Sequence, residues 1–206
     1  MRMLDILGSS PVIPVVTIDH LNDCVPLARA LIRGGIKVME VTLRTDCGLE
    51  AISQIAAEVP EMIVGAGTLT SPADLESAVN AGAKFGVSPG ISRELLQVAK
   101  QANLPFLPGI QTPSELMFAA QYGYKCFKIF PAQVNVVKAL MGPFSQYHFC
   151  PTGGIGPDNM NDYFRLKGVI SVGGSWLAPK DHVQNHLWDE VAKLASTALG
   201  QVNRNQ

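Results

Sequence analysis

The 206 residues are 47% hydrophobic and 16% charged, which is enough to bury one sizeable core and is typical of a single domain. A net charge of -1 and a pI near 6.4 argue against binding to nucleic acid or to an anionic membrane surface. No apolar run approaches the roughly 18 residues of a membrane span and the first residues lack a signal peptide's apolar core, so we expect a cytoplasmic protein that binds a small molecule.

Strand-like apolar runs alternate with helical patterns along the chain. The strand candidates are residues 12–18, 36–43, 62–65, 85–88, 106–108, 125–130, 148–151 and 169–173. The helix candidates are residues 24–33, 49–58, 72–81, 93–102, 113–122, 159–166 and, closing the chain, 181–199. This alternation implies parallel strands, and eight of them predict a single-domain (β/α)8 TIM barrel over residues 1–206, with a short N-terminal segment 1–10. The alternative is an open doubly wound sheet, but the run GAGTLT at 65–70 lacks the third glycine of its fingerprint.

An internal repeat supports the barrel. Ser71 and Thr112 are each followed by a proline and, three residues on, by an acid, which predicts a helix N-cap with a capping box. Gly35, Gly82 and Gly123 each stand two residues before a lysine at a strand entrance, as expected for helix exits. Three strands therefore share one register.

This register places an acid and a lysine in the same interior layer. Three residues beyond the strand-entrance lysines stand Glu40, Val87 and Lys128, on strands two, four and six of the predicted barrel. Burial disfavours the charged form of an amine and leaves a neutral nucleophile that can attack a carbonyl. We therefore predict that Lys128 is a nucleophile and Glu40 its acid/base partner. The alternatives are a structural ion pair and a lysine whose ammonium reaches solvent.

Further binding residues are predicted at the C-terminal strand ends, where barrels hold their active sites. Arg44 follows the second strand and can hold a carboxylate bidentately, and Thr68 follows the third. A solvated arginine and a loop hydroxyl are the alternatives. Glycine pairs at 153–154 and 173–174 follow the last two strands, where bare backbone N–H groups can approach an anion closely. These pairs predict a phosphate site, and simple turn geometry is the alternative.

No metal site or cofactor is predicted. Among the histidines, only His182 and His186 have helical spacing, and a solvated face of the terminal helix explains that pair better than zinc does. The cysteines are far apart and form no C-x-x-C pair, so we expect Cys24, Cys47, Cys126 and Cys150 to be reduced and buried. An iminium on Lys128 would itself be the electron sink, which makes metal-free catalysis possible.

Six short motifs occur in order along nearly the entire chain: EVTLRT at 40–45, GAGT at 65–68, GVSPG at 86–90, KIFPA at 128–132, PTGG at 151–154 and GGSWL at 173–177. Together they resemble the bacterial 2-keto-3-deoxy-6-phosphogluconate (KDPG) aldolases and the related 4-hydroxy-2-oxoglutarate (KHG) aldolases. The resemblance implies a class I aldolase on a (β/α)8 barrel, usually a homotrimer. Such an enzyme reversibly splits KDPG into pyruvate and glyceraldehyde 3-phosphate, in the Entner–Doudoroff pathway of carbohydrate metabolism.

The resemblance also implies a role for each site residue. Lys128 would form the Schiff base with the pyruvate carbonyl, and Glu40 would move protons through a water. Arg44 and Thr68 would hold the pyruvate carboxylate. The remaining implied contacts are Pro89 and Phe130 around the pyruvyl methyl carbon, Thr152 on the hydroxyls of the aldehyde portion, and Gly153, Gly154, Gly174 and Ser175 on the phosphate.

One segment departs from the family pattern. Residues 133–142, just after the KIFPA motif, look about one helical turn shorter than in the family and lack its usual glycines. The preferred aldehyde is therefore left open between the KDPG reaction, the KHG reaction and cleavage of 2-keto-3-deoxy-6-phosphogalactonate. Outside this chemistry, the alternatives are a phosphate-binding barrel isomerase with Glu40 as the base and a catalytically silent sugar-phosphate binding protein.

Overall fold

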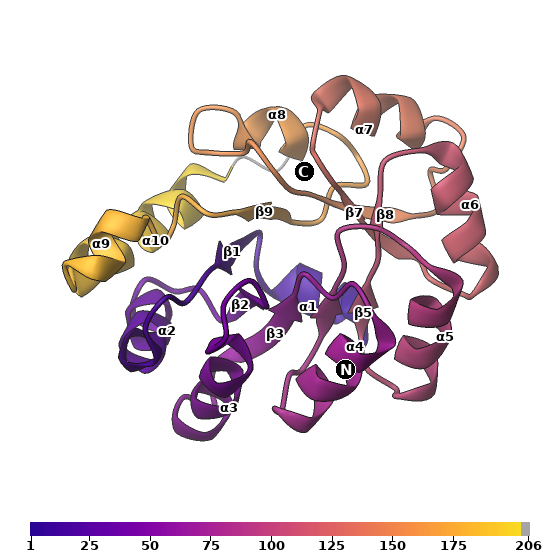
Figure 1. Ribbon diagram of the computed structural model, residues 1–206. Helices are drawn as coiled ribbons and strands as arrows, with labels where there is room; N and C mark the ends of the chain where they lie inside the picture. Colours follow the sequence, from indigo (N-terminus) through magenta and orange to yellow (C-terminus); the bar gives the residue numbers. More distant parts are fainter. Residues whose placement is uncertain (203–206) are drawn as a thin grey trace.

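The computed structural model describes residues 1–202 as an α/β fold with two parallel sheets. The larger sheet curls through six strands in the order β5-β4-β3-β2-β1-β9 (Figure 1). Its strands are β1 Val12–Val16, β2 Val38–Thr42, β3 Ile63–Gly67, β4 Gly86–Val87, β5 Phe106–Leu107 and β9 Val172–Gly174. The smaller sheet, in the order β6-β7-β8, consists of β6 Gly109–Ile110, β7 Cys126–Ile129 and β8 His148–Pro151. The predicted alternation of parallel strands with helices is confirmed.

The two sheets meet at both of their edges. Isolated parallel bridges join Phe149 to Val169 and Thr152 to Gly173, between the ends of β8 and β9. At the other edge only Pro108 separates β5 from β6. The sequence predicts a strand over residues 106–108 that ends at this proline, whereas the chain resumes strand structure at Gly109; proline has no backbone N–H to give to a sheet, so it separates the two short strands. The strand near 106–110 therefore splits its pairing between β4 and β7.

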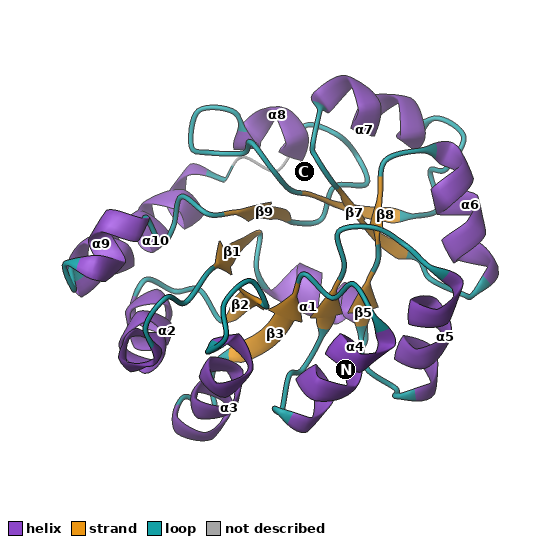
Figure 2. Ribbon diagram, in the orientation of Figure 1, coloured by secondary structure: helices purple, strands orange, loops and turns teal. Residues whose placement is uncertain are grey.

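Most of the helices form an outer layer around the strands, whereas α1 lies behind the strands at the centre of the view (Figure 2). The helices are α1 Met3–Ser9, the 3-10 helix η1 Leu21–Asp23, α2 Cys24–Arg33, α3 Gly48–Glu58, α4 Pro72–Asn80, α5 Arg93–Gln101, α6 Pro113–Gln121, α7 Val134–Met141, α8 Met160–Phe164, α9 Lys180–Gln184 and α10 Trp188–Gln201. Within residues 1–202, no helix is long and apolar enough to cross a membrane.

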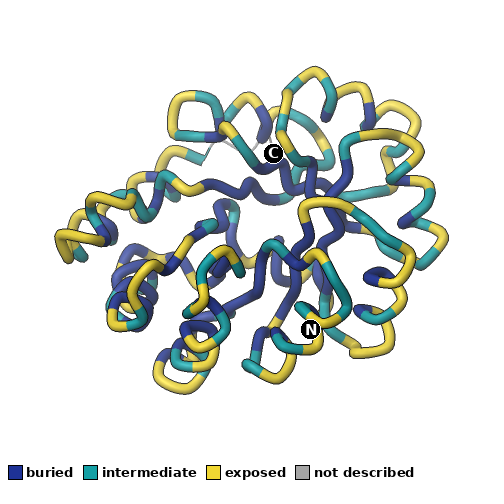
Figure 3. Tube along the Cα trace, in the orientation of Figure 1, coloured by how far each residue is buried: buried dark blue, intermediate teal, exposed yellow. Residues whose placement is uncertain are grey.

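Two apolar clusters hold these layers together. The larger one lies between the strands and the surrounding helices, and the tube in Figure 3 is accordingly buried along the strands and exposed on the outer helix faces. The smaller one joins α1 to strand side chains, because Ile6 and Leu7 pack with Val38, Phe85 and Leu107. Burying large apolar side chains of this kind contributes roughly 1.5–3 kcal/mol each. The N-terminal segment is thus part of the core.

The repeated helix starts form as predicted. Ser71 Oγ accepts a hydrogen bond from the backbone N–H of Asp74 at 3.2 Å, and the Asp74 carboxylate accepts the Ser71 N–H in return at 2.9 Å. Thr112 and Glu115 form the second box at 3.3 and 2.8 Å. The exit residues Gly35, Gly82 and Gly123 have φ values of 91°, 88° and 90°, which glycine adopts without the steric cost of a side chain.

These capping acids make part of the stability depend on pH. Partial burial raises the pKa of the Asp74 carboxyl, but hydrogen bonds from Thr70 and Ser71 outweigh burial and hold that pKa below its usual value. Hydrogen bonds from Gln111 and Thr112 do the same for Glu115. A carboxyl whose pKa is lowered by folding stabilises the protein above its unfolded pKa, and this contribution is lost as the pH falls through the folded value.

Asp74→Asn combined with Glu115→Gln is therefore expected to lower the free energy of unfolding at pH 7 by about 1–2 kcal/mol. The difference from wild type should begin to shrink as the pH falls below about 4, the range of the unfolded carboxyls, and should disappear once the folded carboxyls, whose pKa values are lower, are protonated as well. Urea unfolding at pH 7 and pH 3 measures this change. Glu94→Gln is the control, because Glu94 lies in the first turn of α5 but forms no capping box there. A difference that stays constant with pH would contradict the prediction.

Three expectations about the fold need correction. The predicted helix 181–199 is two helices, α9 and α10, because His186 takes a φ of 54° between them. His182 and His186 therefore do not share one helix face, and His186 Nε2 instead lies 3.2 Å from a carboxylate oxygen of Asp23. Of the free cysteines, three are buried as expected, whereas Cys47 is partly exposed.

Candidate active site

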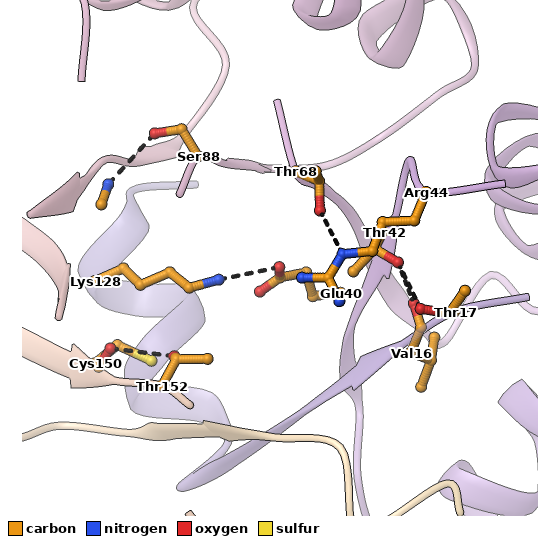
Figure 4. A network of polar contacts seen from close by, with 11 residues as sticks. Val16, Thr17, Glu40, Thr42, Arg44, Thr68, Ser88, Lys128, Cys150 and Thr152 are labelled. Carbon is orange, nitrogen blue, oxygen red and sulfur yellow. Dashed lines mark hydrogen bonds and ion pairs between the residues drawn. The ribbon is translucent and has the colours of Figure 1, made fainter. Parts of the chain in front are cut away.

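A buried ion pair connects the two sheets. Lys128 Nζ on β7 lies 3.3 Å from Glu40 Oε1 on β2, and their side chains are 7% and 5% exposed. Figure 4 shows both side chains extending toward each other across the interior. Two charges removed from water are expensive to bury, and each is tolerated only because the other is there. The predicted proximity of the two residues is confirmed.

Glu40 has room for its side chain because β3 ends in glycine. Gly67 pairs with Thr42 in the β2–β3 register, close to where the Glu40 side chain passes. A Cβ atom at Gly67 would lie 2.6 Å from Glu40 Cγ, closer than such atoms approach in proteins. The glycine therefore leaves the space that lets the carboxylate reach Lys128.

A thiol lies next to Lys128 but does not compete with it as a nucleophile. Cys150 is the register partner of Lys128 on β8 and is buried. Burial raises the pKa of the Cys150 thiol to about 12. Because the thiolate is the reactive form of cysteine, this side chain stays inert near neutral pH.

The next pair along the strand ends is Arg44 and Thr68. Arg44 Nε donates to Thr68 Oγ1 at 3.3 Å, and the two side chains lie beyond Glu40 in Figure 4. Thr68 has a φ of 63°, which is unusual for a β-branched residue and costs about 1–3 kcal/mol. Such strain persists at positions where the surroundings fix the backbone, and these are often functional.

A cavity of about 640 Å³ opens at this end of the strands. The predicted site residues that line it are Arg44, Lys128, Phe130, Thr152, Gly153, Gly154, Gly174 and Ser175. Glu40 and Thr68 do not line the cavity themselves, but they are hydrogen-bonded to Lys128 and Arg44, which do. Pro89 does not line the cavity and is exposed, since the backbone of residues 88–89 packs against Gly109 instead.

The glycines after β8 adopt conformations that expose backbone at the cavity wall. Gly153 and Gly154 have φ values of 97° and 71°, which side-chain-bearing residues rarely adopt. Asn159 holds this turn, because its side chain accepts from Gly156 N–H and donates to the Gly154 carbonyl, both at 2.9 Å. A bare, curved backbone of this kind suits an anion.

The cavity wall also contains charged residues that the motifs did not reveal. Asp19 and Asp23 follow β1, and Lys180 begins α9. Asp23 is 5% exposed, which is rare for a carboxylate. Acids in a helix-start region ordinarily signal a cap, so the sequence held no sign that these would face the site. In residues 1–202, no three His, Cys, Asp or Glu side chains are grouped so that they could hold a metal ion.

A profile of the aldolase family described as "KDPG and KHG aldolase" matches residues 3–194. The chain belongs to this family of aldolases. The KHG/KDPG aldolase of Escherichia coli K12 is 50% identical to it over 198 residues, covering 94% of this chain and 93% of that relative. The 2-dehydro-3-deoxy-phosphogluconate aldolase of Dickeya dadantii is 48% identical over the same shares of both chains.

Solved structures of KDPG aldolases share the fold. That of Legionella pneumophila, with pyruvate captured at low pH as a covalent carbinolamine intermediate, has a TM-score of 0.94 and 41% identity, covering 96% of this chain and 98% of its own. That of Zymomonas mobilis ZM4 with 3-phosphoglycerate has a TM-score of 0.85 and 37% identity, covering 93% and 95%. The aldolase described here is therefore a lyase, as the sequence predicts.

Proposed function

We propose that this aldolase cleaves 2-keto-3-deoxy-6-phosphogluconate to pyruvate and glyceraldehyde 3-phosphate through a Schiff base on Lys128. The observation that carries the proposal is a buried lysine, paired with one carboxylate, at the wall of the cavity. Glu40 Oε1 lies within hydrogen-bonding distance of Lys128 Nζ, so it can accept the proton that the amine must lose before it attacks. A neutral amine can then attack the keto carbonyl.

The steps follow from this arrangement. The Lys128 amine adds to C2 of the keto acid, and the C2 hydroxyl leaves as water with the proton that Glu40 took from Lys128, which gives the iminium and returns Glu40 to its carboxylate form. Glu40, acting through a water, removes the proton of the C4 hydroxyl. The C3–C4 bond then breaks, its electron pair moves into the iminium to form an enamine, and the aldehyde leaves. Protonation at C3 and hydrolysis release pyruvate. The iminium is the electron sink, so the reaction needs no metal or other cofactor.

The other residues bind the substrate in this proposal. Arg44 and Thr68 hold the carboxylate, because a guanidinium presents paired donors to it. Phe130 packs against the methyl carbon, whereas Pro89, which is exposed outside the cavity lining, is assigned no contact. Thr152 contacts the aldehyde hydroxyls. Phosphate binds at Gly153, Gly154, Gly174 and Ser175, which line the cavity and include two glycines with positive φ. The Zymomonas mobilis relative was solved with a phosphorylated acid, 3-phosphoglycerate.

We also propose that the two sheets form one closed barrel. The bridges between β8 and β9, and the single residue between β5 and β6, support closure of both sheets into one (β/α)8 barrel within residues 1–202. The last four residues of the predicted domain 1–206 lie outside the described residues. The homotrimer and the place in the Entner–Doudoroff pathway stay predictions from the family resemblance, and the cytoplasmic location stays a prediction from the sequence.

A second substrate is favoured by the relatives. The Escherichia coli enzyme, at 50% identity, carries both the KHG and the KDPG name. Both reactions release pyruvate from Lys128 and differ only in the aldehyde. Cleavage of 4-hydroxy-2-oxoglutarate at the same site is therefore the second candidate function.

Reduction with borohydride in the presence of pyruvate is expected to trap one pyruvate on the peptide that contains Lys128. Mass measurement of the digested protein identifies that peptide, and omission of pyruvate is the control. Folded protein without an adduct on this peptide would overturn the aldolase mechanism and favour an isomerase in which Glu40 is the base. Cleavage rates should then be compared for KDPG, its galactonate epimer and the unphosphorylated acid. Far better cleavage of the unphosphorylated acid would contradict the phosphate assignment.

A further inference from the structure

An ion pair lies across the part of the cavity where the phosphate is proposed to bind. Lys180 Nζ lies 2.8 Å from Asp19 Oδ2, with side chains that are 72% and 34% exposed. Both residues line the same cavity as Gly174 and Ser175. Lys180 begins α9, which follows the loop after β9 (Figure 1). The pair therefore joins the loop after β1 to the start of α9.

The distribution of charge in the cavity leaves the phosphate without a cation other than Lys180. The lysines and arginines of the cavity wall, within the described residues, are Arg44, Lys128 and Lys180. Lys128 is bound to Glu40, and Arg44 is bound to Thr68 near the proposed carboxylate site. The glycine N–H groups carry no net charge.

Two carboxylates make the need for a cation stronger. Asp19 and Asp23 line the cavity, and a phosphate dianion there would be repelled by both. Asp23 is buried and lies 3.2 Å from His186 Nε2. Asp19 is more exposed and has Lys180 as its partner. An exposed lysine–carboxylate pair is weak because water screens it, so Lys180 can leave Asp19 at little cost.

We propose that Lys180 is the residue that selects phosphorylated substrates, by turning from Asp19 to the phosphate when the substrate binds. Its flexible stem allows the ammonium to move between two acceptors, and the phosphate attracts it more strongly because it carries more charge than a carboxylate. Asp19 then returns to solvent. With an unphosphorylated substrate the Lys180–Asp19 pair stays closed. This inference rests on the proposed position of the phosphate.

The experiment measures binding of glycerol 3-phosphate by calorimetry, and the kcat/KM values for KDPG and 4-hydroxy-2-oxoglutarate, in Lys180→Met. Loss of one charge-assisted contact to phosphate is expected to weaken glycerol 3-phosphate binding about 10- to 100-fold. The ratio of kcat/KM for KDPG over the unphosphorylated acid should fall by a similar factor, mainly through KM. Lys180→Arg should recover most of the affinity, and Asp19→Asn should increase it, because Lys180 is then free and one repulsive charge is gone.

Lys193→Met is the matched control, because Lys193 is also exposed and paired with a carboxylate, Glu190 at 3.7 Å, but lies on α10 away from the cavity lining. Wild-type glycerol 3-phosphate affinity in Lys180→Met, or an equal loss in Lys193→Met, would overturn the inference. Phosphate binding that depends on Lys180 without any pyruvate adduct on Lys128 would support this inference while refuting the aldolase mechanism. A pyruvate adduct on Lys128 in a wild-type protein that does not bind glycerol 3-phosphate would support the aldolase mechanism and refute this inference.

Discussion

Replacement of Lys128 with methionine is expected to abolish both cleavage and pyruvate trapping. The amine is the only group in the proposed reaction that bonds to the substrate carbon, so its loss should lower kcat/KM on the order of 10⁴-fold or more. Initial rates of KDPG cleavage, measured by pyruvate release, give this number. Cleavage within tenfold of the wild-type rate would show that Lys128 is not the nucleophile.

The same variant is expected to be less stable than wild type, so loss of activity could come from unfolding as well as from the missing amine. Methionine suits the apolar surroundings of Lys128, but it leaves the Glu40 carboxylate buried and without its cation. Removal of one partner from a buried ion pair typically costs about 3–5 kcal/mol. The double variant Lys128→Met with Glu40→Met removes both charges and should recover most of this loss.

Urea unfolding of the single and double variants separates folding from chemistry. If both are inactive and the double variant is nearly as stable as wild type, the inactivity comes from the missing amine. A single variant that is as stable as wild type would mean that Glu40 does not depend on Lys128 in the folded protein. Thermal unfolding of Lys193→Met controls for the loss of a lysine as such, because Lys193 is exposed on α10.

The register of the fold could be predicted because it depends on short-range patterns. A hydroxyl, a proline and an acid at fixed spacing determine where α4 and α6 begin, and glycines with positive φ determine where these helices end. Counting from those points was sufficient to place Glu40 and Lys128 in one layer, although 88 residues separate them in the sequence.

Other features depend on contacts that no local pattern reveals. The segment after Phe130 is helix α7, yet its first residue has no side-chain cap, and it is held by burial of Val137 and Leu140 against the core. The break at His186 falls beside the contact between His186 Nε2 and Asp23, which is far away in the sequence. The ion pair between Lys180 and Asp19 likewise joins two segments that are far apart in the sequence.

The family motifs predicted some of the cavity residues correctly and others not. The KIFPA motif placed Lys128 and Phe130 at one site, and both line the cavity. The GVSPG motif implied that Pro89 belongs there too, but its side chain is exposed outside the lining residues. A motif fixes residue identities along a strand, whereas the direction of a side chain just beyond the strand end depends on the loop that follows.

Replacement of Glu40 with glutamine is expected to slow cleavage while still allowing pyruvate to be trapped on Lys128. The amide keeps the size and the hydrogen-bonding oxygen of the carboxylate but cannot accept a proton in the reaction. Loss of a positioned acid/base group typically lowers kcat by about 10²- to 10⁴-fold. Trapping should become slower, because the lysine loses the group that takes its proton, but it should reach the same final extent.

Single-turnover cleavage and the time course of borohydride trapping measure these two effects in the same protein. Gly67→Ala is the companion variant, since its new Cβ would displace the intact Glu40 side chain rather than neutralise it. It should reproduce the slow cleavage with the carboxylate still present. Complete loss of trapping in Glu40→Gln, equal to that in Lys128→Met, would mean that Glu40 is needed to form the covalent intermediate at all. Cleavage at the wild-type rate would remove Glu40 from the reaction and leave the buried pair with a structural role only.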